Sequence, residues 1–285
     1  MSSSASNSNR LRLILAAVVF VMILGAAGAM LLRGEPAPDT PEPAPEPKTT
    51  EPVQTPAIPL PPPPLTRAEL LDMVEAAASA YAAGEPAPED QAGLAGRQFR
   101  IRIPFGCYGP RRAGSESSAG WEYADEGRTI RLSVAPEAWA DTAFVAQLGG
   151  GPYEAVEGFW IPRPWMASDA CPPIRVDPLG GGAPAASPQT VGLAAFFEAD
   201  SSRVNQRGDR PWQAAVRAPE GETLERPAGF HLIVEGRLEA FADGRPVRCN
   251  SAGPDQRPVC LIRMQREYVA FAPIGSDEII QEWRS

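Results

Sequence analysis

The hydrophobic positions divide the chain into three stretches with different patterns. Leu13–Leu32 is an unbroken apolar run, whereas Gly34–Pro64 has few large apolar side chains and is rich in proline. From about Leu94 onward, apolar and polar residues alternate in short runs, which is typical of half-buried strands. We therefore expect a cytoplasmic tail over residues 1–12, a transmembrane signal anchor over 13–32, a proline-rich extended linker over 33–64, an amphipathic helix over 65–84 and an exported β-rich domain over 94–285.

The apolar run Leu13–Leu32 has the length that crosses a bilayer, since about 20 helical residues span the hydrocarbon core. Arg10 and Arg12 precede it, and acidic residues dominate the segment behind it. The positive-inside bias then places the amino terminus in the cytoplasm and the main domain outside the inner membrane. The alternative is a cleavable signal peptide with a small-residue site at Ala27–Ala29. In both cases the bulk of the chain is exported.

The linker and the helix after it have clear local signals. Many of the 33 prolines lie in Gly34–Pro64, so this segment favours an extended polyproline II spacer. Thr66 and Glu69 then form a capping-box pattern, and Gly84 supplies a left-handed stop. One face of the helix is apolar and consists of Leu70, Met73, Val74, Ala77 and Tyr81.

The exported part reads as a mainly β domain with a few short helices. Two runs flank Asp125–Gly127 as a predicted hairpin, and Phe230–Phe241 is the best-defined strand. Many short strands with Gly/Pro turns favour a predominantly antiparallel β-sandwich or partly open barrel. A short carboxy-terminal helix is expected from Ser276 through Trp283.

The four cysteines all lie in the exported part, and an even count beyond a membrane anchor indicates disulfides in an oxidising compartment. Cys249 and Cys260 flank a short loop between two predicted strands, so they are the natural pair. Cys107 and Cys171 remain as the second pair. A four-thiolate zinc site is the alternative, but no two cysteines have the close spacing that such sites use.

Composition and charge remove several classes of function. The chain has 285 residues with 26 basic and 35 acidic side chains, and its formal charge of −9 argues against nucleic acid as a partner. The single histidine, His231, disfavours histidine-based catalysis and metal binding. We predict no metal, no cofactor and no assigned catalytic residue. Carboxylate pairs remain open, because acid chemistry needs no motif.

One cluster of aromatic and arginine residues suggests recognition. The triplet Arg-Pro-Trp occurs twice, and arginine stacked on tryptophan is common in recognition patches. The alternative is that both tryptophans fill the core and the arginines pair with acids. The candidate binding residues are Trp160, Arg163, Trp165, Arg210 and Trp212.

The order of tail, anchor, Glu-Pro-rich spacer and terminal domain resembles the TonB architecture of energy-transducing envelope proteins, and also components of secretion and division machinery. This resemblance covers Arg10 to Pro64. It implies a protein held in the bacterial inner membrane through Leu13–Leu32, with its main domain in the periplasm. The leading hypothesis is a β-rich binding or scaffold module for an envelope protein or glycan. The alternative is a periplasmic hydrolase that acts on envelope polymers through acidic residues.

Overall fold

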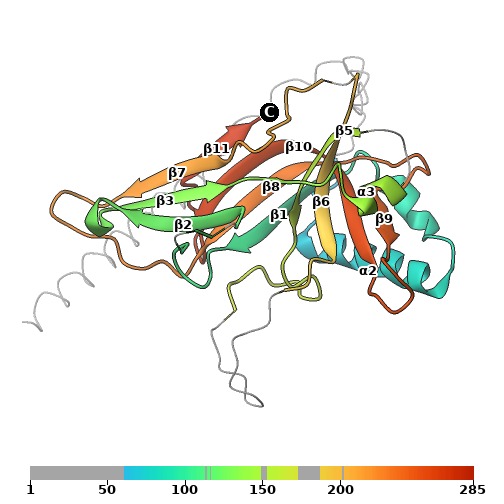
Figure 1. Cartoon of the computed structure of the whole chain (residues 1–285), viewed down its shortest axis with the longest axis horizontal. Helices are drawn as coiled ribbons and strands as arrows, with labels where there is room; N and C mark the ends of the chain where they lie inside the picture. Colours follow the sequence, from blue (N-terminus) through green and yellow to red (C-terminus); the bar gives the residue numbers. More distant parts are fainter. Residues whose placement is uncertain (1–60, 113, 116, 149–152, 173–186, 201) are drawn as a thin grey trace, which may run out of the picture. The chain divides into compact units, whose positions relative to one another are not determined.

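The computed structural model describes residues 61–285 apart from 113, 116, 149–152, 173–186 and 201. The predicted tail, anchor and nearly all of the linker lie outside the described residues. Among the helices that are described, none is both long and apolar enough to cross a membrane. The described chain is mainly β, with two sheets and a few short helices (Figure 1).

Helix α2 (Arg67–Ala83) begins and ends where its local signals predict. The Thr66 hydroxyl accepts a hydrogen bond from the Glu69 backbone N–H, and the Glu69 carboxylate accepts one from the Thr66 backbone N–H. Gly84 closes the helix with φ +69°, a left-handed conformation that glycine adopts without strain. The apolar face, including Leu70 and Val74, is buried against β1, β9 and β10.

The larger sheet has the strand order β1-β8-β10-β6-β5-β4, with β9 and β11 also paired to β10. Its neighbours are antiparallel except β6 and β10, which run parallel, so the predominantly antiparallel prediction has this one exception among the named strand pairs. The strands are β1 (Gln98–Phe105), β4 (Glu137–Ala138), β5 (Tyr153–Trp160), β6 (Val191–Glu198), β8 (Phe230–Leu238), β9 (Val247–Asn250), β10 (Val259–Pro273) and β11 (Gln281–Arg284).

Strand β10 connects the two parts of the larger sheet, because each of its halves pairs with different strands. Its first half, Val259–Arg263, pairs with β9 on one edge and β6 on the other. Its second half pairs with β8 and β11, with a register shift between Arg266 and Tyr268. The single long strand therefore joins the β1/β8 region to the β4/β5/β6 region.

The smaller sheet has the order β2-β3-β7, formed by β2 (Ala119–Ala124), β3 (Thr129–Val134) and β7 (Trp212–Arg217). The first two strands make the predicted hairpin. Its turn is a short 3₁₀ segment, η2 (Asp125–Gly127), in which all three residues have positive φ. In Figure 1 this sheet lies at one end of the domain, and helices α2 and α3 (Ala143–Leu148) lie at the other.

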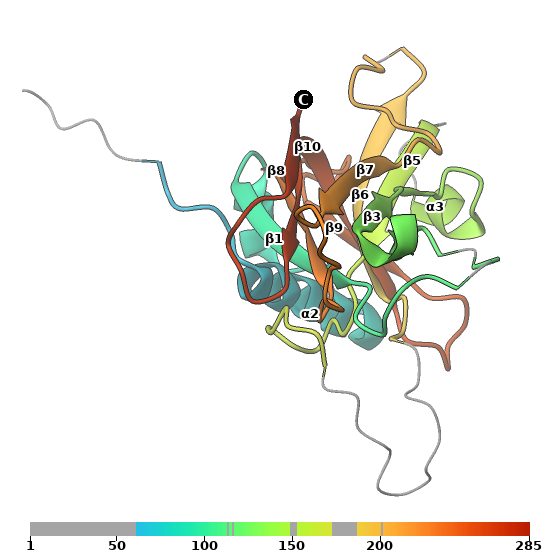
Figure 2. The same cartoon turned by 90° about the vertical axis from the view of Figure 1, so that its left-hand side faces the viewer.

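The main hydrophobic core lies between the two sheets. Trp121 and Leu132 of the smaller sheet join Phe99 and Leu232 of the larger one in one buried cluster. A second cluster packs helix α3 (Ala143–Leu148) on β5 and β6, and Figure 2 shows this helix on that side of the domain. A 3₁₀ segment, η1 (Glu89–Leu94), connects α2 to β1.

The predicted carboxy-terminal helix is wrong. Gln281–Arg284 forms strand β11 on the second half of β10, and Tyr268 lies opposite Arg284. Trp283 packs on Phe271, with ring centroids 5.1 Å apart. The segment extends because it satisfies the edge of β10 and covers the Phe271 ring, which a helix over Ser276–Trp283 could not do through its backbone.

Candidate functional site

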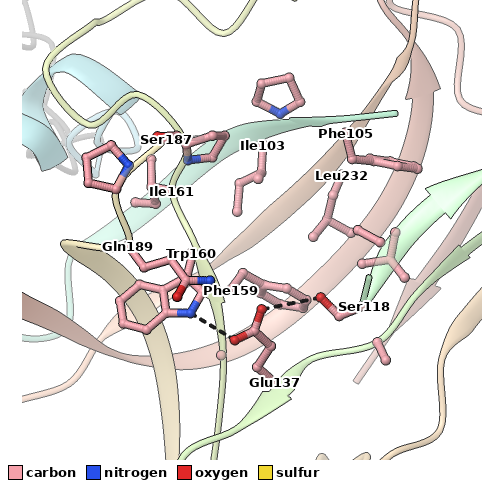
Figure 3. Close-up of a pocket in the computed structure, with 17 residues that line it drawn as sticks. Ile103, Phe105, Ser118, Glu137, Phe159, Trp160, Ile161, Ser187, Gln189 and Leu232 are labelled. Carbon is pink, nitrogen blue, oxygen red and sulfur yellow. Dashed lines mark hydrogen bonds between the residues drawn. The ribbon is translucent and has the colours of Figure 1, made fainter. Parts of the chain in front are cut away.

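A cleft opens between the two sheets, with a volume of about 220 Å³. Its walls come from strands far apart in the sequence, and Figure 3 shows their side chains converging on it. Most of the wall is apolar, and a few polar side chains interrupt it. The apolar lining includes Ile103, Phe105, Phe159, Ile161 and Leu232, and the polar lining includes Ser118, Glu137, Ser187 and Gln189.

Glu137 provides the one carboxylate among the residues that line this cleft. Its Oε2 accepts a hydrogen bond from Trp160 Nε1 at 2.8 Å and a longer one from Trp139 Nε1 at 3.3 Å. Its Oε1 accepts a hydrogen bond from the Ser118 hydroxyl at 3.4 Å (Figure 3). The carboxylate is thus held in a fixed position by two indoles and a hydroxyl.

The two indoles form a pair, with ring centroids 4.5 Å apart. Trp139 lies against Gly158 and Gly192, where any Cβ would collide with its ring, so these glycines leave the space that the indole fills. Strand β4 sets this arrangement, because Glu137 lies opposite Gly158 in the register. The local backbone therefore presents both the carboxylate and its indole donors.

A second cavity of about 380 Å³ adjoins the first. Trp160 and Gln189 line both cavities, so the two share a rim. The second cavity is also mainly apolar, with Trp139, Phe144 and Leu261 in its wall and the amides of Gln147 and Asn250 at its side. We refer to these two neighbouring cavities, which share Trp160 and Gln189, as the groove.

Of the five predicted binding residues, Trp160 lines this groove. Arg163 lies just beyond β5 with a positive φ of 50°, and its guanidinium donates to the Ala170 carbonyl within the same segment. Trp165 is 60% exposed. Arg210 donates to the carbonyls of Arg207 and Gln206 in its own loop.

Trp212 is buried, and its partners are not the arginines of the two triplets. The guanidiniums of Arg207 and Arg266 lie over its ring, 4.7 and 4.8 Å from the centroid. Its ring also packs on Phe159, with centroids 5.8 Å apart. The second Arg-Pro-Trp element thus has its tryptophan in the core, and the first has its tryptophan at the surface.

Beside Trp212 lies a buried carboxylate that is fully engaged. The backbone N–H groups of Arg207 and Gly208 donate to Glu157 at 2.9 and 2.5 Å. Arg266 lies 3.9 Å from the same carboxylate and also donates to the Asn205 carbonyl. Burial lowers the pKa of Arg266 to about 10, and the Glu157 charge opposes that change. This cluster anchors the loop that precedes β7.

The four cysteines form two disulfides, Cys107–Cys171 and Cys249–Cys260, which is the predicted pairing. The first joins the turn after β1 to the segment after β5. Two disulfides are consistent with an oxidising, extracytoplasmic compartment.

Two buried side chains hold the same segment after β5. Arg67 donates to the carbonyls of Pro162 and Met166, and His231 Nε2 lies 3.0 Å from the Asp169 carbonyl oxygen. Burial is the largest cause of the lowered pKa of Arg67, and the charge of Arg163 adds to it. Pro162 lines the cleft, so the Arg67 hydrogen bond fixes one part of its border.

Sequence reasoning missed Glu137. A lone glutamate after a proline carries no spacing signal, and its place depends on the pairing of β4 with β5. Among the described residues, no group of three His, Cys, Asp or Glu side chains could hold a metal ion. Comparisons with protein-family models, curated proteins and solved structures find no match for this chain.

Proposed function

We propose that the chain is a single-pass protein of the bacterial inner membrane whose periplasmic domain is a binding module at the end of a proline-rich spacer. The ligand lies in the groove around Trp160 and is part of an envelope protein or glycan. The two sheets with a shared core support a β-sandwich as the scaffold. The anchor Leu13–Leu32, the spacer and the two disulfides support the location.

The observation that carries this proposal is the chemistry of the cleft. It joins apolar walls to a few fixed polar groups, which is how small-ligand and side-chain pockets are built. Its carboxylate is already oriented by Trp160 and Trp139 before any ligand arrives. Preorganised groups lower the entropic cost of binding, because fewer side chains must become ordered in the complex.

The hydrolase alternative needs different chemistry. Glycoside hydrolysis uses two carboxyl groups, one on each side of the scissile bond. The described residues that line the groove contribute one carboxylate, Glu137, whose oxygens accept hydrogen bonds from indoles and a hydroxyl. A single fixed acceptor suits recognition better than acid–base catalysis.

The test is to fill the cleft without disturbing the core. Ala135 lines the cleft, whereas Ala138 is exposed and lies outside both cavities. Ala135→Phe in the full chain should abolish capture of the envelope partner from solubilised membranes, and Ala138→Phe should leave capture unchanged. Both variants should melt near the wild-type temperature. Equal capture by Ala135→Phe and the wild type would show that the cleft is not the binding site.

A further inference from the structure

The cleft contains a negative charge with no cationic partner among the described residues. Glu137 accepts hydrogen bonds from two indoles and a hydroxyl, all of them neutral donors. Other glutamates of the domain differ: Glu154, Glu235 and Glu267 each pair with an arginine. A half-buried carboxylate beside an apolar wall is stabilised by an opposite charge, so the cleft is complementary to a cation.

The two oxygens of Glu137 are unequally engaged. Oε2 receives both indole N–H groups, at 2.8 and 3.3 Å, whereas Oε1 receives only the Ser118 hydroxyl at 3.4 Å. One oxygen is therefore open to a further donor. A guanidinium binds a carboxylate best through two parallel hydrogen bonds, which requires both oxygens. An ammonium is a compact point donor and needs only one.

The rest of the cleft suits an aliphatic stem. Phe159, Leu232 and Ile103 supply apolar walls, and the cavity has a volume of about 220 Å³. A lysine side chain buries its methylene groups against apolar surface while its ammonium stays with polar partners.

The neighbouring cavity indicates where the rest of the ligand lies. It shares Trp160 and Gln189 with the cleft and has apolar walls that suit a second side chain. We propose that the groove binds an extended segment of a partner polypeptide, with one lysine side chain in the inter-sheet cleft and its ammonium on Glu137 Oε1. The flanking residues cross Trp160 toward the second cavity. This inference rests on the proposed function and names the ligand of the same site.

The experiment follows the indole N–H resonances of the full chain in detergent micelles during peptide titration. The probes are acetyl-Ala-Lys-Ala-amide, the same peptide with norleucine, which keeps the stem and lacks the charge, and free n-hexylammonium. The lysine peptide should shift the Trp139 and Trp160 resonances saturably and bind about tenfold more tightly than the norleucine peptide. In Glu137→Gln, which retains an acceptor for the indoles, the two peptides should bind equally.

Several outcomes would overturn the proposal. Equal affinity of the wild type for the lysine and norleucine peptides would show that the cleft does not recognise an ammonium group. This comparison does not depend on the folding of any variant. If hexylammonium binds as tightly as the lysine peptide, the ligand need not be a polypeptide. If a glycan fragment shifts the same resonances and the peptides do not, the ligand is not a polypeptide. If Ala135→Phe still abolishes partner capture in any of these cases, the binding function stands and only its ligand class is wrong.

Discussion

Two neighbouring glutamates on paired strands have opposite surroundings. Glu157 is 2% exposed and receives two backbone N–H groups and a buried arginine, so its charge is fully matched within the fold. Glu137 on β4 lies opposite Gly158, the residue after Glu157 on β5. It accepts hydrogen bonds only from neutral donors and faces a cleft. The comparison indicates that a satisfied buried charge maintains the structure, whereas an unmatched charge at a cavity is available to a ligand.

The largest expected effect concerns the tryptophan beside Glu157. Trp212→Ala should lower the free energy of unfolding by about 5 kcal/mol, because it creates a cavity and removes the ring between Arg207 and Arg266. Trp165→Ala is the matched control: its side chain is 60% exposed, so the change should stay within about 0.5 kcal/mol. Urea unfolding measures both, and similar losses would contradict the division into core and surface elements.

Loss of either disulfide should have the next largest effect on the free energy of unfolding, and the two losses should differ in size. The Cys107–Cys171 bridge closes 64 residues and the Cys249–Cys260 bridge closes 11. Loop entropy then predicts losses of about 4 and about 3 kcal/mol when each pair is changed to serine. The longer bridge also holds the segment after β5, which contributes Ile161 and Pro162 to the Glu137 cleft. Its loss should therefore weaken partner capture in molecules that remain folded, and unchanged capture would show that the cleft does not depend on this bridge.

A smaller effect appears at alkaline pH. Burial and the Glu282 hydrogen bond raise the pKa of Tyr268 from 10.0 to about 12. The contribution of protonated Tyr268 to the free energy of unfolding is therefore complete below pH 10 and is lost as the pH rises toward 12. Arg266 acts in the opposite direction, since burial lowers its pKa and the folded state loses that proton first. Tyr268→Phe should flatten the loss of stability between pH 9 and 11, as urea unfolding at both values would reveal. An unchanged slope would assign the loss to other groups.

Local signals in the sequence were sufficient for the elements that depend on neighbours. The Thr66–Glu69 capping box and the turn at Asp125–Gly127 are set by residues a few positions apart, and both are present. In the carboxy-terminal segment, Ser276 as a helix cap predicts a helix through Trp283. The strand in this segment depends on the edge of β10, which is supplied by residues distant in the sequence.

The site illustrates the same limit. Trp160 is a candidate from the sequence because it lies near arginine and other aromatic residues, and in the structure it lines the cleft. Trp165 and Trp212 occur in identical triplets, yet one lies at the surface and the other starts strand β7 facing the core. Glu137 became recognisable only through the register of β4 and β5 and the two indoles that this register brings together.

The most direct measurement compares Glu137→Gln with Glu157→Gln by urea unfolding of the full chain under one set of conditions. Both substitutions keep the side-chain shape and remove the charge. Glu157→Gln should cost about 3 kcal/mol, because it leaves the Arg266 charge buried and uncompensated. Glu137→Gln should stay within about 0.5 kcal/mol of the wild type, since its partners are neutral. A comparable loss in Glu137→Gln would mean that this carboxylate supports the fold and would contradict its assignment to recognition.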